Sequence, residues 1–132
     1  MRVLLADDSG LILERLQDMV KLYNHTEIVG SLKNGTETLK ALRNLRPDLA
    51  IVDIKMPGLN GLEVLNEIRK EDKSLKFIIL TFYSSDYYRK LAIQYGADYF
   101  FNKVDDFDKL ELVVAEMVWK EDNDNRIKTV SD

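Results

Sequence analysis

The sequence alternates short apolar runs with longer segments of helical periodicity, and this pattern constrains the fold more than any other feature. Five runs have the length and composition of β-strands: residues 2–7, 27–32, 49–54, 77–82 and 98–101. The first, third and fourth are almost continuously apolar, as is typical of strands covered on both faces. The alternation predicts a parallel sheet with right-handed crossovers and helices on both faces, which is a three-layer, doubly wound α/β domain.

Helical periodicity marks the segments between and after these runs. Apolar residues share one helical face in three sets: Ile12, Leu16, Met19, Val20 and Tyr23; Leu62, Leu65 and Ile68; Leu110, Val113, Val114, Met117 and Val118. Asn60, followed three residues later by Glu63, has the form of a capping box. A helix is therefore predicted to begin directly after the loop that contains Pro57 and Gly58.

The length of the chain limits it to one domain. With 132 residues, 45% of them hydrophobic, it can build one packed core but not two ordinary ones. From about Glu121 the apolar periodicity stops and the sequence becomes polar. We therefore expect a domain over residues 1–120, followed by a polar tail or the start of a linker over residues 121–132.

Charge and composition exclude several classes of function. A net charge of −4 argues against a broad electrostatic grip on nucleic acid or on an anionic membrane surface. The chain has no cysteine, no segment resembling an export signal near its start and no apolar run long enough to span a bilayer. We expect a cytoplasmic protein that binds neither nucleic acid nor membrane directly.

Polar residues gather where the predicted strands end. Asp7 and Asp8 follow the first strand, Asp53 ends the third, Thr81 ends the fourth and Lys103 lies just beyond the fifth. In an open α/β sheet, ligands bind beyond the carboxyl ends of the strands, where the strand order reverses. Three carboxylates at one place repel one another and call for a cation, and a hydrated, all-oxygen ligand set is what Mg²⁺ prefers. The ammonium and the hydroxyl complete a cradle for a tetrahedral oxyanion.

These residues, in this order and spacing, closely resemble the receiver domains of two-component response regulators. The resemblance extends from residue 1 to about residue 120. It depends on the acidic pair Asp7-Asp8, on DIKMPGLNG beginning at Asp53, on Thr81, and on Lys103 after GADYFFN. It implies a flavodoxin-like fold with five parallel strands in the order 2-1-3-4-5.

The resemblance also implies roles for single residues. Asp53 would be the phosphoacceptor, and Mg²⁺ would be held by Asp8, Asp53 and the main-chain carbonyl of Lys55, with Asp7 acting mostly through water. Thr81 would bond to the phosphoryl group and Lys103 would pair with its oxygens. Phosphate would come from the phosphohistidine of a sensor histidine kinase or a phosphotransfer protein. The protein would then be a signalling switch with weak self-catalysed phosphotransfer and autodephosphorylation, not an enzyme acting on metabolites.

Other functions remain open on the residues alone. A Mg²⁺-dependent phosphohydrolase with an aspartyl nucleophile also places an aspartate at a strand end. Such enzymes have a second acid two residues after the nucleophile, and here Lys55 occupies that position. A flavodoxin-type FMN carrier is disfavoured by the acids after the first strand, which would repel a phosphate. A docking module that works without phosphorylation is disfavoured because every expected site residue is present. His25, the only histidine, is expected to be a solvated loop residue.

Aromatic residues point to a signalling surface. Eight of the twelve lie between Phe82 and Phe101, in the expected fourth helix and fifth strand. Phe100 falls where receivers usually keep an aromatic switch residue, which in the family swings inward when Thr81 is drawn to the phosphoryl group. We therefore expect the fourth helix, fifth strand and fifth helix to bind an output partner or a second copy.

Three further positions carry expectations about the loops around the site. Lys55 and Tyr83 each lie two residues beyond a site residue, and we expect them to restrict water at the phosphoryl pocket. Val104 follows Lys103 where many receivers have proline, and we expect a trans peptide bond there.

Overall fold

Five parallel strands form the centre of the molecule in the computed structural model, which describes the backbone of residues 1–131 and the side chains of residues 1–124. The strands are β1 (Arg2–Ala6), β2 (Glu27–Leu32), β3 (Leu49–Val52), β4 (Lys76–Thr81) and β5 (Tyr99–Asn102). Their order is β2-β1-β3-β4-β5, which confirms the prediction. The β1 and β3 strands end just before Asp7 and Asp53, so both carboxylates lie on the loops rather than in the ladder.

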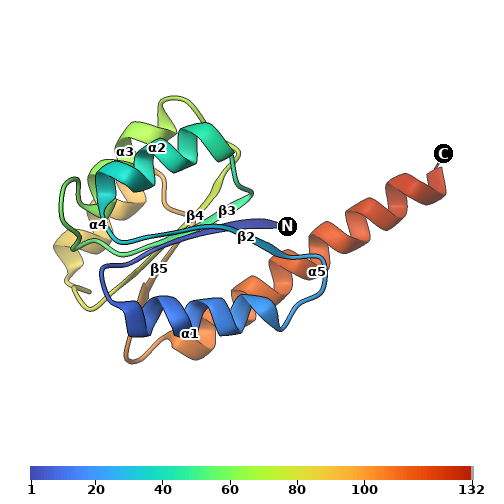
Figure 1. Ribbon diagram of the computed structural model, residues 1–132, viewed down its shortest axis with the longest axis horizontal. Helices are drawn as coiled ribbons and strands as arrows, with labels where there is room; N and C mark the ends of the chain where they lie inside the picture. Colours follow the sequence, from blue (N-terminus) through green and yellow to red (C-terminus); the bar gives the residue numbers. More distant parts are fainter. Residues whose placement is uncertain (132) are drawn as a thin grey trace.

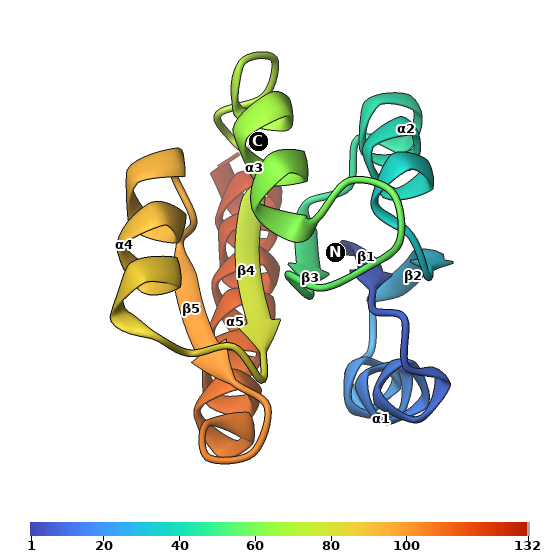
Figure 2. The same cartoon turned by 90° about the vertical axis from the view of Figure 1, so that its left-hand side faces the viewer.

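Five helices cover the two faces of the sheet. They are α1 (Gly10–Lys21), α2 (Gly35–Leu45), α3 (Gly61–Arg69), α4 (Asp86–Tyr95) and α5 (Phe107–Ser131). Figure 1 shows α1 and α5 on one face and α2, α3 and α4 on the other, and Figure 2 shows the same layers after a quarter turn. The predicted three-layer architecture is confirmed.

Alternating side chains of the strands fill two hydrophobic cores, one under each helical layer. Leu4, Ala50, Phe77 and Ile79 point towards α2, α3 and α4, whereas their neighbours Val3, Leu5, Ile51 and Ile78 point towards α1 and α5. This follows from the two-residue period of a strand. Phe100 and Phe101 alternate in the same way between the two cores.

Side-chain caps fix where the helices begin. The predicted capping box at the start of α3 is present: the Glu63 N–H donates to Asn60 Oδ1 (2.9 Å), and the Asn60 N–H donates to Glu63 Oε1 (3.1 Å). Ser9 and Ser85 cap α1 and α4. Two caps, Ser9 and Asn60, close the loops that follow β1 and β3, so they help to position the acidic residues on those loops.

The last helix is longer than the apolar pattern indicates. The sequence predicts a polar tail from about Glu121, whereas α5 continues as a helix through Ser131 and projects beyond the body (Figure 1). Extending an existing helix needs no new nucleation, so a polar segment can continue it without an apolar face of its own. The domain boundary at residue 120 stays a prediction. Among the described residues, no helix is both long and apolar enough to cross a membrane.

Candidate functional site

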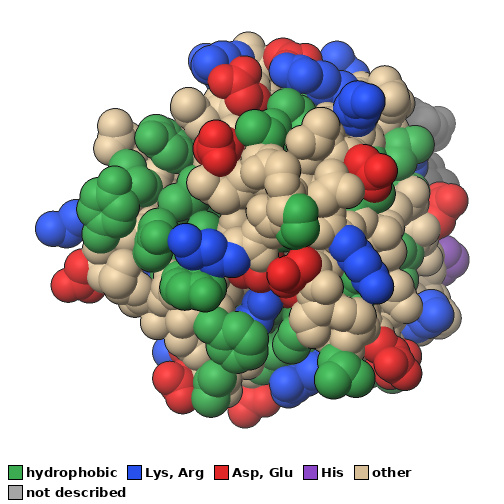
Figure 3. All heavy atoms as spheres, turned by 60° about the vertical axis from the view of Figure 1, so that its left-hand side comes forward, with side chains coloured by type: hydrophobic (Ala, Val, Ile, Leu, Met, Phe, Trp, Pro, Cys, Tyr) green, Lys and Arg blue, Asp and Glu red, His purple; other side chains and the backbone are tan. Residues whose placement is uncertain are grey.

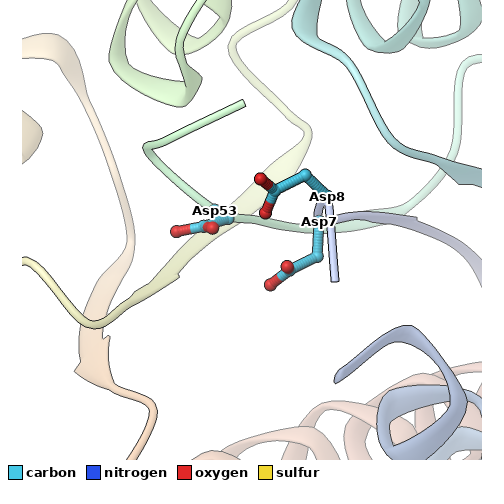
Figure 4. Close-up of side chains that lie close together, drawn as sticks. All are labelled: Asp7, Asp8 and Asp53. Atoms are coloured by element: carbon cyan, nitrogen blue, oxygen red, sulfur yellow. The ribbon is translucent and has the colours of Figure 1, made fainter. Parts of the chain in front are cut away.

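The predicted site residues converge at the carboxyl end of the sheet. Asp7 and Asp8 follow β1, Asp53 follows β3, Thr81 ends β4 and Lys103 follows β5. Figure 4 shows the carboxylates of Asp7, Asp8 and Asp53 extending into the same space. Asp8 is exposed, whereas the other four are buried.

Lys103 links the two buried carboxylates. Its Nζ lies 2.6 Å from Asp7 Oδ2 and 2.9 Å from Asp53 Oδ2. Asp7 is only 1% exposed and Asp53 5% exposed, so the ammonium neutralises charge that would otherwise stand unpaired in a poorly hydrated place. The ammonium also lies 4.8 Å from the centroid of the Phe82 ring.

The pKa values reflect this competition between burial and pairing. Burial, and then the neighbouring charge of Asp53, raise the pKa of Asp7, although the bonds from Lys103 and the Ser9 N–H act in the opposite direction. Burial lowers the pKa of Lys103, but its hydrogen bonds to Asp7 and Asp53 outweigh that effect and leave the pKa raised. The lysine is therefore charged at neutral pH.

The backbone holds Asp53 in place from three sides. Its N–H donates to the Ala6 carbonyl of β1 (2.9 Å), and its Oδ1 accepts from the Ile54 N–H (2.7 Å). The start of α3 packs directly against it, because a Cβ at Gly61 would lie 2.0 Å from the Asp53 carbonyl oxygen. Glycine is therefore required there. This role of Gly61 was not predicted from the sequence, although its position directly after the Asn60 cap was a usable signal.

The three aspartates can hold a cation. One carboxylate oxygen from each of Asp7, Asp8 and Asp53 lies within 4.8 Å of the others. The donors are all oxygen and the exposed Asp8 leaves the site open to water, and this combination fits Mg²⁺ better than Zn²⁺.

Thr81 is fully buried at the end of β4, and its hydroxyl is already engaged. Its Oγ1 accepts a 3.1 Å hydrogen bond from the Tyr83 N–H, so the hydroxyl orders the loop that follows. The Tyr83 ring lies 5.1 Å from Lys55 Nζ, and the Tyr88 ring lies 5.6 Å from it. Lys55 and Tyr83 were predicted from the sequence to lie near the site. Tyr88 was not predicted, because only the start of α4 brings it beside them.

Phe100 is found in an inward position. It is 7% exposed and packs in the core beneath α4. The guanidinium of Arg89, on α4, lies 4.8 Å from the centroid of its ring.

Two of the expectations about loops, those for Val104 and His25, are met. The structure has no cis peptide bond in the part of the chain that it describes, so Lys103–Val104 is trans. His25 is exposed and lies before β2, at the opposite end of the sheet from the aspartates.

The surface around the site carries acidic, basic and hydrophobic side chains. Figure 3 shows acidic side chains at the centre of this face, with basic side chains and a group of hydrophobic side chains around them. Large exposed side chains at this end include Leu11, Phe82, Tyr83, Tyr87 and Val104.

Comparisons with known proteins agree with this geometry. The sequence model of the response regulator receiver domain matches residues 3–115. YesN of Bacillus subtilis (strain 168), an uncharacterized transcriptional regulatory protein, is 29% identical over 121 residues, which cover 88% of this chain and 33% of YesN. YvfU of the same strain, described in the same words, is 32% identical over 117 residues, covering 89% of this chain and 58% of YvfU.

A solved structure shows the same fold. The response regulator domain of Thermotoga maritima CheB superposes with a TM-score of 0.79 at 28% identity, covering 91% of this chain and 94% of that domain. The chain spans less than two thirds of the length of the curated relatives YesN and YvfU, but nearly the whole of this isolated domain.

Proposed function

Because the chain belongs to the response regulator receiver domain family, we propose that Asp53 accepts a phosphoryl group from the phosphohistidine of a sensor histidine kinase or a phosphotransfer protein. The observation that supports this most directly is the ion-paired triad of Asp7, Asp53 and Lys103 beside the open carboxylate of Asp8. It combines a buried nucleophile with a fixed positive charge, at the end of the sheet where ligands bind.

A divalent cation belongs in this proposal because of charge. A phosphoryl group adds roughly −1.5 to −2 charges beside three carboxylates. Asp8 and Asp53 are the residues we assign to hold Mg²⁺, with the Lys55 main-chain carbonyl, and Asp7 through water. When bound, Mg²⁺ supplies positive charge that offsets this repulsion and stabilises the transferring phosphoryl group.

The other residues act on the phosphoryl oxygens. The Lys103 ammonium is already held at Asp53 Oδ2, so it can pair with a phosphoryl oxygen without being brought from solvent. The Thr81 Oγ1 accepts from the Tyr83 N–H, which leaves the Thr81 O–H free to donate to another phosphoryl oxygen. Attack of water on the same acyl phosphate would release inorganic phosphate and restore the Asp53 carboxylate, which is the autodephosphorylation that we expect.

The output is a change in the surface formed by α4, β5 and α5. Phe100 connects the site to this surface, since it lies three residues before Lys103 and packs beneath α4. We assign Phe100 as the two-state element of this surface. The partner is another protein domain or a second copy, and the protein works in the cytoplasm without direct contact to nucleic acid or membrane.

The test is incubation with acetyl phosphate and Mg²⁺, followed by intact mass measurement. We expect one added phosphoryl group on the parent protein and none on Asp53→Asn. The matched control is Asp105→Asn, because Asp105 is an exposed aspartate close after Lys103 and should not affect labelling. Equal labelling of the parent and Asp53→Asn would contradict the assignment. Omitting Mg²⁺ should abolish the gain in mass.

A further inference from the structure

Tyr83 is attached to the site at two points. Its backbone N–H donates to Thr81 Oγ1 (3.1 Å), and the centroid of its ring lies 5.1 Å from Lys55 Nζ. Thr81 ends β4, and Lys55 follows Asp53 by two residues. Both attachments therefore come from groups that border the Asp53 carboxylate in the chain or in the sheet.

The same cation also reaches α4. Lys55 Nζ lies 5.6 Å from the centroid of the Tyr88 ring, and the Tyr83 and Tyr88 rings meet edge to face with centroids 6.4 Å apart. Tyr88 belongs to the first turn of α4, where its N–H donates to the capping Ser85 Oγ (3.4 Å). One ammonium thus bridges the loop after β3, the loop after β4 and the start of α4.

We propose that Lys55 couples phosphorylation to α4 by changing partners. When Asp53 carries a phosphoryl group, Lys55 leaves the Tyr83 and Tyr88 rings for the phosphoryl oxygens while the Thr81 hydroxyl turns the same way. Both attachments of Tyr83 are then lost together. This inference rests on the proposed function. It involves no covalent step, because only ionic contacts and hydrogen bonds change.

The exchange follows from the strengths of the two contacts. A cation over an exposed aromatic ring is weakly held, whereas a hydrogen-bonded pair between an ammonium and a phosphate is among the stronger polar contacts. Lys55 is exposed on a flexible four-carbon stem, so it can move without disturbing the core. Lys103 is buried and already bonded to Asp7 and Asp53, so its single charge is shared before the phosphoryl group arrives.

The consequence is a second connection between the site and the signalling surface. Phe100 of β5 contacts α4 through the guanidinium of Arg89, whereas Lys55 contacts the first turn of α4 from the site. Losing the shared cation leaves Tyr83 and Tyr88 joined only by their edge contact. The first turn of α4 and the loop before it are then free to move, even if Phe100 keeps its inward position.

The test is NMR of the lysine ε-methylene groups in the full chain, with and without beryllofluoride and Mg²⁺. In the free protein, the signal missing from Lys55→Met should lie upfield, because the two rings shield it. Tyr88→Leu should move that signal downfield, and Tyr87→Leu should not, since Tyr87 touches the Tyr88 ring (5.5 Å) without being one of the rings beside Lys55. Binding of the mimic should remove the upfield shift and speed hydrogen exchange of the Tyr83 amide.

Two outcomes separate the inference from the function on which it rests. If the ¹⁹F spectrum shows the mimic bound to the parent and not to Asp53→Asn while the Lys55 signal stays upfield, the exchange of partners is wrong and the phosphoacceptor assignment stands. If the mimic binds Asp53→Asn as well as the parent, both the proposed function and the inference that depends on it are wrong.

Discussion

The two ends of the sheet use aspartate in opposite ways. At the amino end, Asp48 and Asp98 come directly before β3 and β5, and each accepts a 2.7 Å hydrogen bond from the first part of a neighbouring strand, from the Arg2 N–H and the Phe77 N–H respectively. At the carboxyl end, Asp7 and Asp53 come directly after β1 and β3, and the ammonium of Lys103 joins them.

This difference separates carboxylates that complete the backbone hydrogen bonding from those that we assign to the candidate site. Asp48 and Asp98 are exposed, and each adds one hydrogen bond at the start of a neighbouring strand. The first N–H groups of a parallel strand need such an acceptor where no strand carbonyl faces them. Asp7 and Asp53 are buried with like charge beside them, an arrangement that costs stability unless a cation is present. The aspartates before β3 and β5 accept backbone hydrogen bonds of neighbouring strands, whereas those after β1 and β3 lie at the candidate site.

Removing the cation at each end should give the largest contrast. Lys103→Met leaves two buried carboxylates unpaired, so we expect a loss of roughly 2–4 kcal/mol in the free energy of unfolding. Arg69→Met, which breaks the partly exposed pair with Asp98 (3.1 Å), should cost only about 1 kcal/mol. Urea denaturation without divalent ions measures both.

Adding Mg²⁺ sharpens this contrast. A bound cation replaces the charge lost with Lys103, so the deficit of Lys103→Met should narrow, while that of Arg69→Met should not change. If Lys103→Met and Arg69→Met lost equal free energy of unfolding, with no effect of Mg²⁺, the carboxylates at the carboxyl end would not depend on a cation more than those at the amino end.

The affinity of the protein for Mg²⁺ should depend on the carboxylates at the carboxyl end of the sheet and not on those at the amino end. Asp8 is exposed and outside the Lys103 pairs, so Asp8→Asn removes a ligand without leaving a buried charge, and we expect affinity to fall about tenfold or more. Asp48→Asn is the matched control at the amino end, where the amide oxygen can still accept from the Arg2 N–H. Isothermal titration calorimetry should show the loss for Asp8→Asn alone.

Acid should act differently at the two ends. At the amino end, Asp72 is partly buried, yet the bonds that Ser74 and Leu75 donate to its Oδ1 lower its pKa below the ordinary value of 3.8. A lowered pKa means that the ionised form stabilises the fold above about pH 4 and that this contribution is lost as the pH falls through the folded pKa. Because solvent screens this partly exposed carboxylate, Asp72→Ala should cost only about 0.5 kcal/mol at neutral pH and less near pH 2.

The raised pKa of Asp7 gives the opposite sign. The buried surroundings of Asp7 disfavour its ionised form. The contribution of Asp7 to the free energy of unfolding therefore falls as the pH rises from the ordinary pKa of the carboxyl through its raised folded pKa. Carboxyl ¹³C titrations without divalent ions should place Asp7 above its ordinary value and Asp72 below it. The reverse order would contradict the division between the two ends.

The strands of the fold and the positions of the candidate site residues could be predicted from the sequence, whereas the roles of those residues stay predictions. The apolar runs gave the strands within about two residues, and the polar residues at their ends gave Asp7, Asp8, Asp53, Thr81 and Lys103. These predictions succeeded because the period of a strand and the parallel topology together determine where its end points.

The features that could not be predicted depend on side-chain orientation between distant elements. Phe100 was placed correctly in β5, but its inward position depends on packing beneath α4 and on Arg89, which no local pattern encodes. Tyr88 joins Lys55 only because the loop after β3 and the start of α4 meet. The helical continuation of α5 was missed because the apolar pattern reports burial, not helicity.

The smallest predicted effect concerns Tyr83, and the matched residue at the amino end is Tyr99. Both are partly exposed, 48% and 39%, but Tyr83 follows Thr81 whereas Tyr99 begins β5 and stacks on Phe101 (5.6 Å). We expect Tyr83 to limit the access of water to the acyl phosphate on Asp53, so Tyr83→Ala should speed dephosphorylation roughly two- to fivefold. Tyr99→Ala removes similar aromatic area far from the site and should leave the rate unchanged. The decay of protein labelled with acetyl phosphate, followed by intact mass after the donor is removed, measures both. If Tyr83→Ala decays at the parent rate, the ring does not shield the phosphoryl group, and its role is confined to the contacts with Lys55 and Tyr88.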